Sequence, residues 1–169
     1  MASYTDQDFD RFITLSAALT GFTRSDLLGT GVGGQYYGLV FDIAGADICG
    51  ELFSAFESIA RRNRAGSDGY NDAIGARILQ NPKIGPVARN IIKMWYLGNW
   101  DQMPFPWREQ YGAHPRDVNH VVSAHAYTEG LVWRAIGSHP PGAKQPGFGT
   151  WSVEPSIEPF LARAQRGTK

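Results

Sequence analysis

The sequence predicts a mainly α protein: one small helical domain followed by an irregular C-terminal arm rich in proline and glycine. Three observations lead to this fold class. Apolar residues recur every three to four positions through the first two-thirds of the chain. Capping residues and glycines mark where the periodic stretches begin and end. Past Gly98 the periodicity fails, and residues 137–151 hold four glycines and three prolines.

Two helix starts are marked near the N-terminus. Thr5-x-x-Asp8 resembles a capping box, in which a side chain accepts from the free backbone amides of the first turn. The apolar positions that follow are spaced for one helical face, and Gly21 ends that helix. Thr23-x-x-Asp26 predicts a second cap ahead of another short helix.

The middle of the chain carries a long apolar stretch. Residues 36–43 fit either a helix or a strand, and we favour a helix because their neighbours are helical. Asp47 is expected to cap a clearer helix, which ends near Arg61 and Arg62, where cations interact favourably with the helix dipole.

Two further helices are expected before the periodicity fails. A short one is stopped at Asn81-Pro82, and the next begins at Pro86, which suits a first helical position, and closes at Gly98. Beyond it, a short element is expected around 118–127 and an extended piece over 131–136. We therefore divide the chain into a helical domain, residues 1–126, and an extended C-terminal arm, residues 127–169.

Charge and composition exclude several classes of function. Lysine and arginine number 16, as do aspartate and glutamate, so the basic excess that nucleic-acid binding requires is missing. No apolar run approaches the roughly 20 residues that span a bilayer. Aromatic residues make up 12% of the chain and charged residues 19%, a balance that fits either a large core or a protein interface.

The first residues, MASYTDQDFD, are acidic and do not resemble a secretory signal, which favours a cytoplasmic location. Export together with a signal-bearing partner is the periplasmic alternative.

Cysteine and histidine give little support to a metal site. Cys49 is the single cysteine, so a thiolate cluster or an intrachain disulfide has no second ligand, and we expect a small buried side chain. The histidines lack metal-binding spacing; His120 and His125, five residues apart, do not share a helix face. No nucleophile elbow is present. We expect no metal, cofactor or catalytic residue in this chain.

Gly29-x-Gly31-x-x-Gly34 matches the dinucleotide-binding fingerprint in letters only. That fingerprint works where a strand leads into the first glycine and a helix opens at the last. The preceding residues 24–28 read as a helical turn instead. A loop that needs positive φ is the favoured interpretation.

Trp95 and Trp100 bracket the densest aromatic stretch. It fits a stacked sugar less well than a helix end packed into the core, with Gly98 as the C-cap.

Residues 137–151, in which Lys144 is the one charged residue, are too aromatic and too poor in charge for an ordinary solvated linker. We therefore expect the C-terminal arm to lie on another surface, either the core of this chain or a partner. Glu129 and Arg134 fit a buried or a surface contact. Pre-shaped prolines and large apolar side chains are what a docking segment requires. The predicted interface residues are Tyr127, Glu129, Trp133, Arg134, Pro140, Lys144, Phe148 and Trp151.

Four motifs occur in an order that resembles a known family: Phe12-Ile13-x-Leu15-Ser16-x-x-Leu19-Thr20-Gly21, Ile78-Leu79, Trp95-Tyr96-Leu97-Gly98-x-Trp100, and Tyr127-x-Glu129-Gly130-Leu131-Val132-Trp133-Arg134 continuing to Pro146-Gly147-Phe148. Over roughly residues 9–153 the chain resembles the small, non-catalytic subunit of FAD-dependent sugar and polyol dehydrogenases, such as the sorbitol, glucose, gluconate, fructose and glucoside 3-dehydrogenases.

The resemblance implies a heterodimer. The large subunit, of the glucose–methanol–choline oxidoreductase type, would hold FAD and, in several members, an iron–sulfur cluster; a cytochrome c subunit joins some complexes. The small subunit would support folding, stability and, in some members, export. The missing twin-arginine leader favours the cytosolic, glucoside 3-dehydrogenase branch. A stand-alone sugar-binding helical protein and a self-associating structural protein remain the alternatives.

Overall fold

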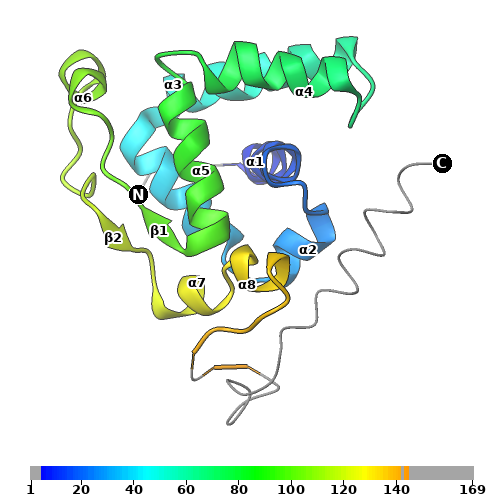
Figure 1. The fold of residues 1–169 in the computed structure, drawn as a ribbon. Helices are drawn as coiled ribbons and strands as arrows, with labels where there is room; N and C mark the ends of the chain where they lie inside the picture. The colour runs from blue at the N-terminus through cyan, green and yellow to red at the C-terminus, as the bar shows by residue number, and fades with distance from the viewer. Residues whose placement is uncertain (1–4, 142, 145–169) are drawn as a thin grey trace.

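The computed structural model describes residues 5–141, 143 and 144, and these residues are mainly helical. Figure 1 shows α1 (Asp6–Thr20) seen nearly end-on, with α5 (Gly85–Leu97) and α3 (Gly33–Arg62) packed around it. The short α2 (Arg24–Gly29) links α1 to α3. We call residues 5–98, which contain these helices, the helical body.

Both predicted caps are confirmed. Thr5 accepts from the backbone amide of Asp8, and Gly21 ends α1 in the left-handed region. Thr23 and Asp26 form a complete capping box, in which each side chain accepts from the other residue's backbone amide. Both capping motifs near the N-terminus therefore begin helices at the residues that the sequence predicted.

Residues 36–43 are helical and lie in the first half of α3, as expected. The expected cap at Asp47 is wrong, because α3 continues from Gly33 to Arg62 with a break at Gly45. Gly45 has φ 77° and ψ 166°, a conformation open only to glycine, so the helix changes direction there. Asp47 lies just beyond the break.

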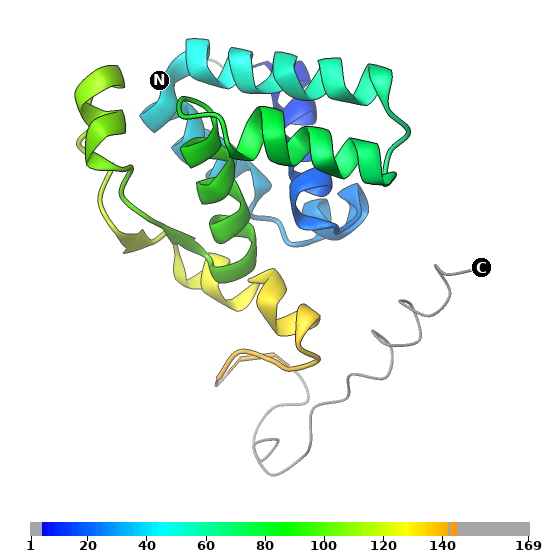
Figure 2. The ribbon, with the colours of Figure 1, turned by 45° about the horizontal axis from the view of Figure 1, so that its top comes forward.

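After α3 the chain turns back on itself. Ser67 caps α4 (Asp68–Ile74), which continues into a π-helical turn, η1 (Gly75–Leu79). Figure 2 shows these two running beside the second half of α3. Pro86 lies in the first turn of α5 and Gly98 closes that helix with φ 71°, both as predicted.

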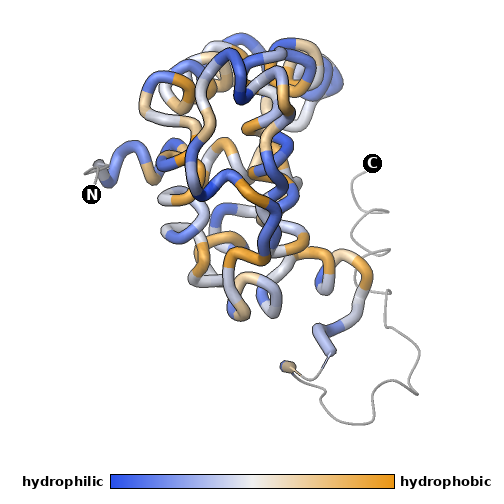
Figure 3. Tube along the Cα trace, turned by 90° about the vertical axis from the view of Figure 1, so that its left-hand side faces the viewer, coloured by the Kyte–Doolittle hydropathy of each residue, from blue (hydrophilic) through white to orange (hydrophobic). Residues whose placement is uncertain are grey.

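The core is formed where α1, α3 and α5 meet. The ring of Trp95 meets Tyr36 edge-on at 5.0 Å and stacks over Phe12 at 6.4 Å, and all three side chains are buried. The hydropathy colouring of Figure 3 shows hydrophobic and hydrophilic residues interspersed along the chain. No helix among the described residues is both long and apolar enough to cross a membrane.

Beyond Gly98 the chain forms short elements. β1 (Asn99–Trp100) and β2 (His120–Val121) pair antiparallel and close a loop that carries α6 (Phe105–Tyr111). Two short helices follow, α7 (Ala124–Thr128) and α8 (Leu131–Ala135). The expectation of an extended piece over 131–136 is therefore wrong: α8 occupies it, because Leu131 is fully buried when that turn packs against α5.

Candidate partner interface

The predicted interface residues that the structure describes gather mostly around α7 and α8, at one end of the molecule (Figure 1). We call this region the α7–α8 face and define it by Leu97, Tyr127, Glu129, Trp133, Arg134 and Ile136. Its foundation is a close approach between α5 and the later helices.

Two glycines permit that close approach. A Cβ atom on Gly98 would lie 2.7 Å from the backbone carbon and oxygen of Ala126. A Cβ atom on Gly130 would lie 2.7 Å from the carbonyl oxygen of Tyr96. Two heavy atoms that are not bonded to each other do not approach to this distance. Only glycine therefore fits at either position. The end of α5 is thereby locked against α7 and the start of α8.

Tyr127 and Trp133 form one aromatic unit. Their rings meet edge-on at 5.6 Å, and the Trp133 indole N–H donates to the Tyr127 carbonyl oxygen at 2.9 Å. Trp133 is half-buried, while Tyr127 remains 39% exposed. The side chains of Leu97 and Ile136 are also exposed. Exposed aromatic and aliphatic side chains of this size are typical anchors of protein interfaces.

Two ion pairs flank the aromatic unit. Arg134 donates to Asp26 at 2.8 Å and its guanidinium lies over the Phe22 ring at 5.4 Å. Lys144 pairs with Glu129 at 2.6 Å. The sequence left open whether Glu129 and Arg134 are buried or exposed: Glu129 is half-buried and Arg134 is exposed.

The Asp26 carboxylate shows how firmly α2 is tied here. A hydrogen bond from the Thr23 hydroxyl, followed by the one from Arg134, lowers the pKa of Asp26 to about 2. Asp26 thus serves as a helix cap and as the anchor of α8. The sequence identified only the first role, because the Arg134 contact spans more than a hundred residues.

The remaining predicted interface residues divide between two outcomes. Pro140 is buried. Phe148 and Trp151 lie outside the described residues. The arm predicted to be extended from residue 127 begins instead with the end of α7 and the whole of α8.

The sequence also contained motifs for a sugar site, a dinucleotide site and a metal site. In the structure, packing in the core or local backbone geometry accounts for the residues of these motifs. Trp95 and Trp100 are buried, so neither ring face is open for a sugar. The glycine cluster follows α2 rather than a strand, and Gly31 has φ 72°, as the loop interpretation expects. His125 faces the Thr30 carbonyl oxygen at 3.1 Å. Within the described ranges, no three His, Cys, Asp or Glu residues are grouped as metal ligands.

Cys49 is buried, which confirms the expectation of a small core side chain. Burial raises the pKa of its thiol to about 12, so at neutral pH it is a protonated, poor nucleophile.

Two of the cavities that open on the surface of the described chain are lined by residues of its helices. One, of about 220 Å³, lies between α1 and the second half of α3 and is lined by Asp10, Arg11, Thr14, Phe53, Phe56 and Glu57. Two of these lining residues, Arg11 and Glu57, form an ion pair at 2.7 Å, and the Arg11 guanidinium lies over the Phe53 ring. The other lies between α5 and the chain that follows β1.

Comparison with protein-family models, with curated proteins and with solved structures finds no match to this chain.

Proposed function

We propose that this chain is the small, non-catalytic subunit of an FAD-dependent sugar or polyol dehydrogenase of the glucose–methanol–choline oxidoreductase type. Its role is to bind and stabilise the large subunit through the α7–α8 face and the C-terminal arm. The large subunit supplies FAD, with an iron–sulfur cluster in some such enzymes, and a cytochrome c subunit is compatible with the same arrangement. A cytoplasmic complex is favoured, with co-export to the periplasm as the alternative.

One observation carries the proposal. Two of the motifs that resemble the small-subunit family, 95–100 and 127–134, meet in space through the close contacts of Gly98 and Gly130. The surface they build has exposed apolar side chains at Leu97 and Tyr127, and ion pairs beside them. An apolar centre with a charged rim is how protein interfaces are commonly arranged.

The chemistry on the described residues supports a binding role. The buried polar side chains Asn90 and Asp117 are engaged with backbone groups of residues 101–103. Four of the residues that define the α7–α8 face are apolar or aromatic: Leu97, Tyr127, Trp133 and Ile136. Such side chains suit contact with a partner rather than proton or group transfer. Removal of hydrogen from the sugar would take place in the large subunit, on its flavin.

The test is co-expression with a candidate large subunit, a flavoprotein of the glucose–methanol–choline oxidoreductase type from the same genome. The expected result is one peak in size-exclusion chromatography that contains both chains and bound flavin. Without this chain, the large subunit should give a lower yield of soluble, flavin-loaded protein and a lower melting temperature. A large subunit that loads flavin equally well alone and elutes separately would refute the proposal.

A matched pair of variants assigns the surface. Leu97→Ala combined with Tyr127→Ala should weaken the complex by about tenfold or more, because interface anchors of this kind contribute on the order of 1–2 kcal/mol each. Val118→Ala removes an equally exposed apolar side chain elsewhere and should leave the affinity unchanged. Equal affinities for both variants would place the interface somewhere other than the α7–α8 face.

A further inference from the structure

A second surface, separate from the α7–α8 face, lies where α6 projects from the body (Figure 1). A groove of about 160 Å³ runs there between the outer side of α5 and the chain that follows β1. Its walls come from both segments. The lining residues are Pro86, Arg89, Asn90, Lys93, Asp101, Gln102 and Pro104.

The groove and its rim carry unpaired positive charge. Lys93 pairs with Asp101, the one carboxylate in the lining. Arg89 donates to the Leu79 carbonyl oxygen and Arg108 donates to that of Met103 at 3.1 Å. Within the residues that the structure describes, neither arginine pairs with a carboxylate. Each guanidinium has five N–H donors in a fork that matches a carboxylate, and only one is used in these bonds.

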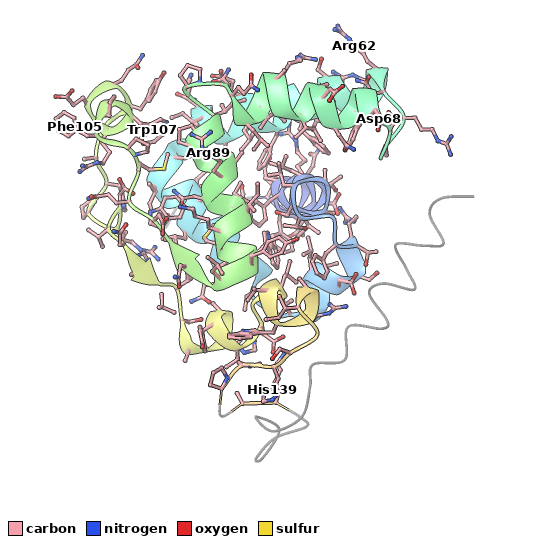
Figure 4. All side chains as sticks on the ribbon, viewed as in Figure 1. Arg62, Asp68, Arg89, Phe105, Trp107 and His139 are labelled. Atoms are coloured by element: carbon pink, nitrogen blue, oxygen red, sulfur yellow. The ribbon has the colours of Figure 1, made fainter. Side chains whose placement is uncertain are left out.

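An exposed aromatic side chain stands beside these charges. Phe105 follows Pro104 at the start of α6 and is 62% exposed, the highest value among the large apolar side chains described. The Arg108 guanidinium lies 5.9 Å from the centre of its ring. Figure 4 labels Phe105 at the outer end of α6 and Arg89 on α5, with Trp107 between them.

Trp107 holds this arrangement in place. It is buried, its indole N–H donates to the Lys83 carbonyl oxygen at 2.8 Å, and its ring meets Tyr111 at 5.3 Å. The helix that carries Phe105 is therefore fixed to the body although its outer side faces solvent. A backbone segment that is already fixed loses little conformational entropy when a partner covers it.

We propose that the groove and Phe105 together bind an acidic segment of a partner protein. Carboxylates of that segment pair with Arg89 and Arg108, and an apolar side chain of it packs on Pro104 and the Phe105 ring. Charge complementarity selects the partner, because the only carboxylate of the groove is already paired with Lys93. Glu109, exposed on α6, places one opposing charge nearby.

Other occupants fit less well. A small inorganic anion would pair with the guanidiniums but leave the Phe105 ring and Pro104 exposed to water. A nucleic acid would require a basic excess, whereas the chain has 16 basic and 16 acidic residues. This proposal does not depend on the identity of the partner. Its test is therefore independent of the proposal that the chain is a dehydrogenase subunit.

The test uses the full-length protein, labelled with ¹⁵N, and the capped peptide Glu-Glu-Leu-Glu-Glu as probe. The expected result is a set of shift changes at the arginine side-chain N–H groups of Arg89 and Arg108 and at the backbone amide of Phe105. A short peptide should bind weakly, with a Kd near about 1 mM. The control peptide Lys-Lys-Leu-Lys-Lys should cause no such changes.

Three variants sharpen the result. Phe105→Ala, on the exposed side of α6, and Arg89→Gln should each weaken peptide binding by about three- to tenfold. Arg77→Gln removes an exposed arginine on η1 and should have no effect.

Four outcomes would overturn the proposal: no shift change at the groove, equal binding of the lysine peptide, complete competition by inorganic phosphate alone, or shift changes at the groove that depend on protein concentration without peptide. The last of these would assign the surface to a second copy of the chain.

Discussion

Trp95 in the helical body and Trp100, Trp107 and Trp133 beyond it are held by different kinds of contact. Trp95 packs between Phe12 and Tyr36, and its indole N–H has no hydrogen-bond partner among the described residues. Each of these three described tryptophans beyond the body donates its indole N–H to one defined acceptor. Trp100 donates to the Asp117 carboxylate, and Trp107 donates to the Lys83 carbonyl oxygen. Trp133 donates to the Tyr127 carbonyl oxygen.

The difference separates two ways of stabilising a structure. The helical body depends on apolar area shared among many side chains, which is non-directional. The described residues from 99 to 144 form short elements with little periodicity, so individual hydrogen bonds fix the course of the chain there. Substitutions in the body should therefore act through lost volume, and substitutions beyond it through lost partners.

The largest effect is expected at the centre of the body. Trp95→Ala removes a buried ring between two others and should lower the free energy of unfolding by about 3–5 kcal/mol. Trp95→Phe keeps most of the volume and loses no hydrogen bond within the described chain, so it should cost less. Urea denaturation followed by circular dichroism measures both. Equal losses for the two variants would show that the indole N–H, rather than volume, matters at this position.

The next effect is expected at Asp117, which is buried and accepts from the Trp100 indole and from the Met103 amide at 2.9 Å each. Asp117→Ala leaves both donors without an acceptor and should cost about 2–4 kcal/mol. Hydrogen exchange should speed up at the Met103 amide before it does in α1 or α5. Asp42→Ala, which breaks an exposed ion pair with Arg116, is the control and should cost less than about 1 kcal/mol.

A matched pair of glycines in the helical body tests the contact between the two regions. Gly21 and Gly98 both end helices with φ near 70°, at 76° and 71°. A Cβ atom on Gly21 would meet nothing within 4 Å, whereas one on Gly98 would overlap the Ala126 backbone. Gly21→Ala should thus cost only the strain of the left-handed conformation, about 1–2 kcal/mol. Gly98→Ala should cost about 1–3 kcal/mol more and should detach α7. Equal losses in thermal denaturation would contradict this packing.

The smallest effect concerns the Asp26 carboxylate, whose pKa of about 2 lies below its ordinary value of 3.8. Because the pKa is lowered in the folded state, its contribution to stability is present above the ordinary value and is lost as pH falls from about 4 to 2. Carboxyl titration by NMR should show a rise in this pKa for Thr23→Val and a smaller rise for Arg134→Gln. A larger rise for Arg134→Gln would reverse the assigned order of causes.

Sequence reasoning predicted the helical body well because its signals are local. The caps at Thr5 and Thr23, Pro86 in the first turn of α5 and the C-cap at Gly98 each act within a few residues. The break at Gly45 escaped prediction, since an apolar stripe continues on both sides of it.

The candidate interface was predictable only in part. The motif 127–134 covers the end of α7 and most of α8, but its helical form depends on packing against α5, which no local pattern encodes. The exposed side chains of Leu97 and Ile136, and the pairing of Arg134 with Asp26, were missed for the same reason: they arise from contacts between residues far apart in the chain.

The thiol of Cys49 is a native probe of how the helical body opens. It is 2% exposed, has a pKa of about 12, and is the single cysteine of the chain, so an alkylating reagent can reach it only when α3 moves away from its neighbours. The rate of labelling therefore reports how readily the body opens, without any engineered probe. The labelling rate, measured with and without a bound partner, shows how much binding at a distant surface slows the local opening of the core.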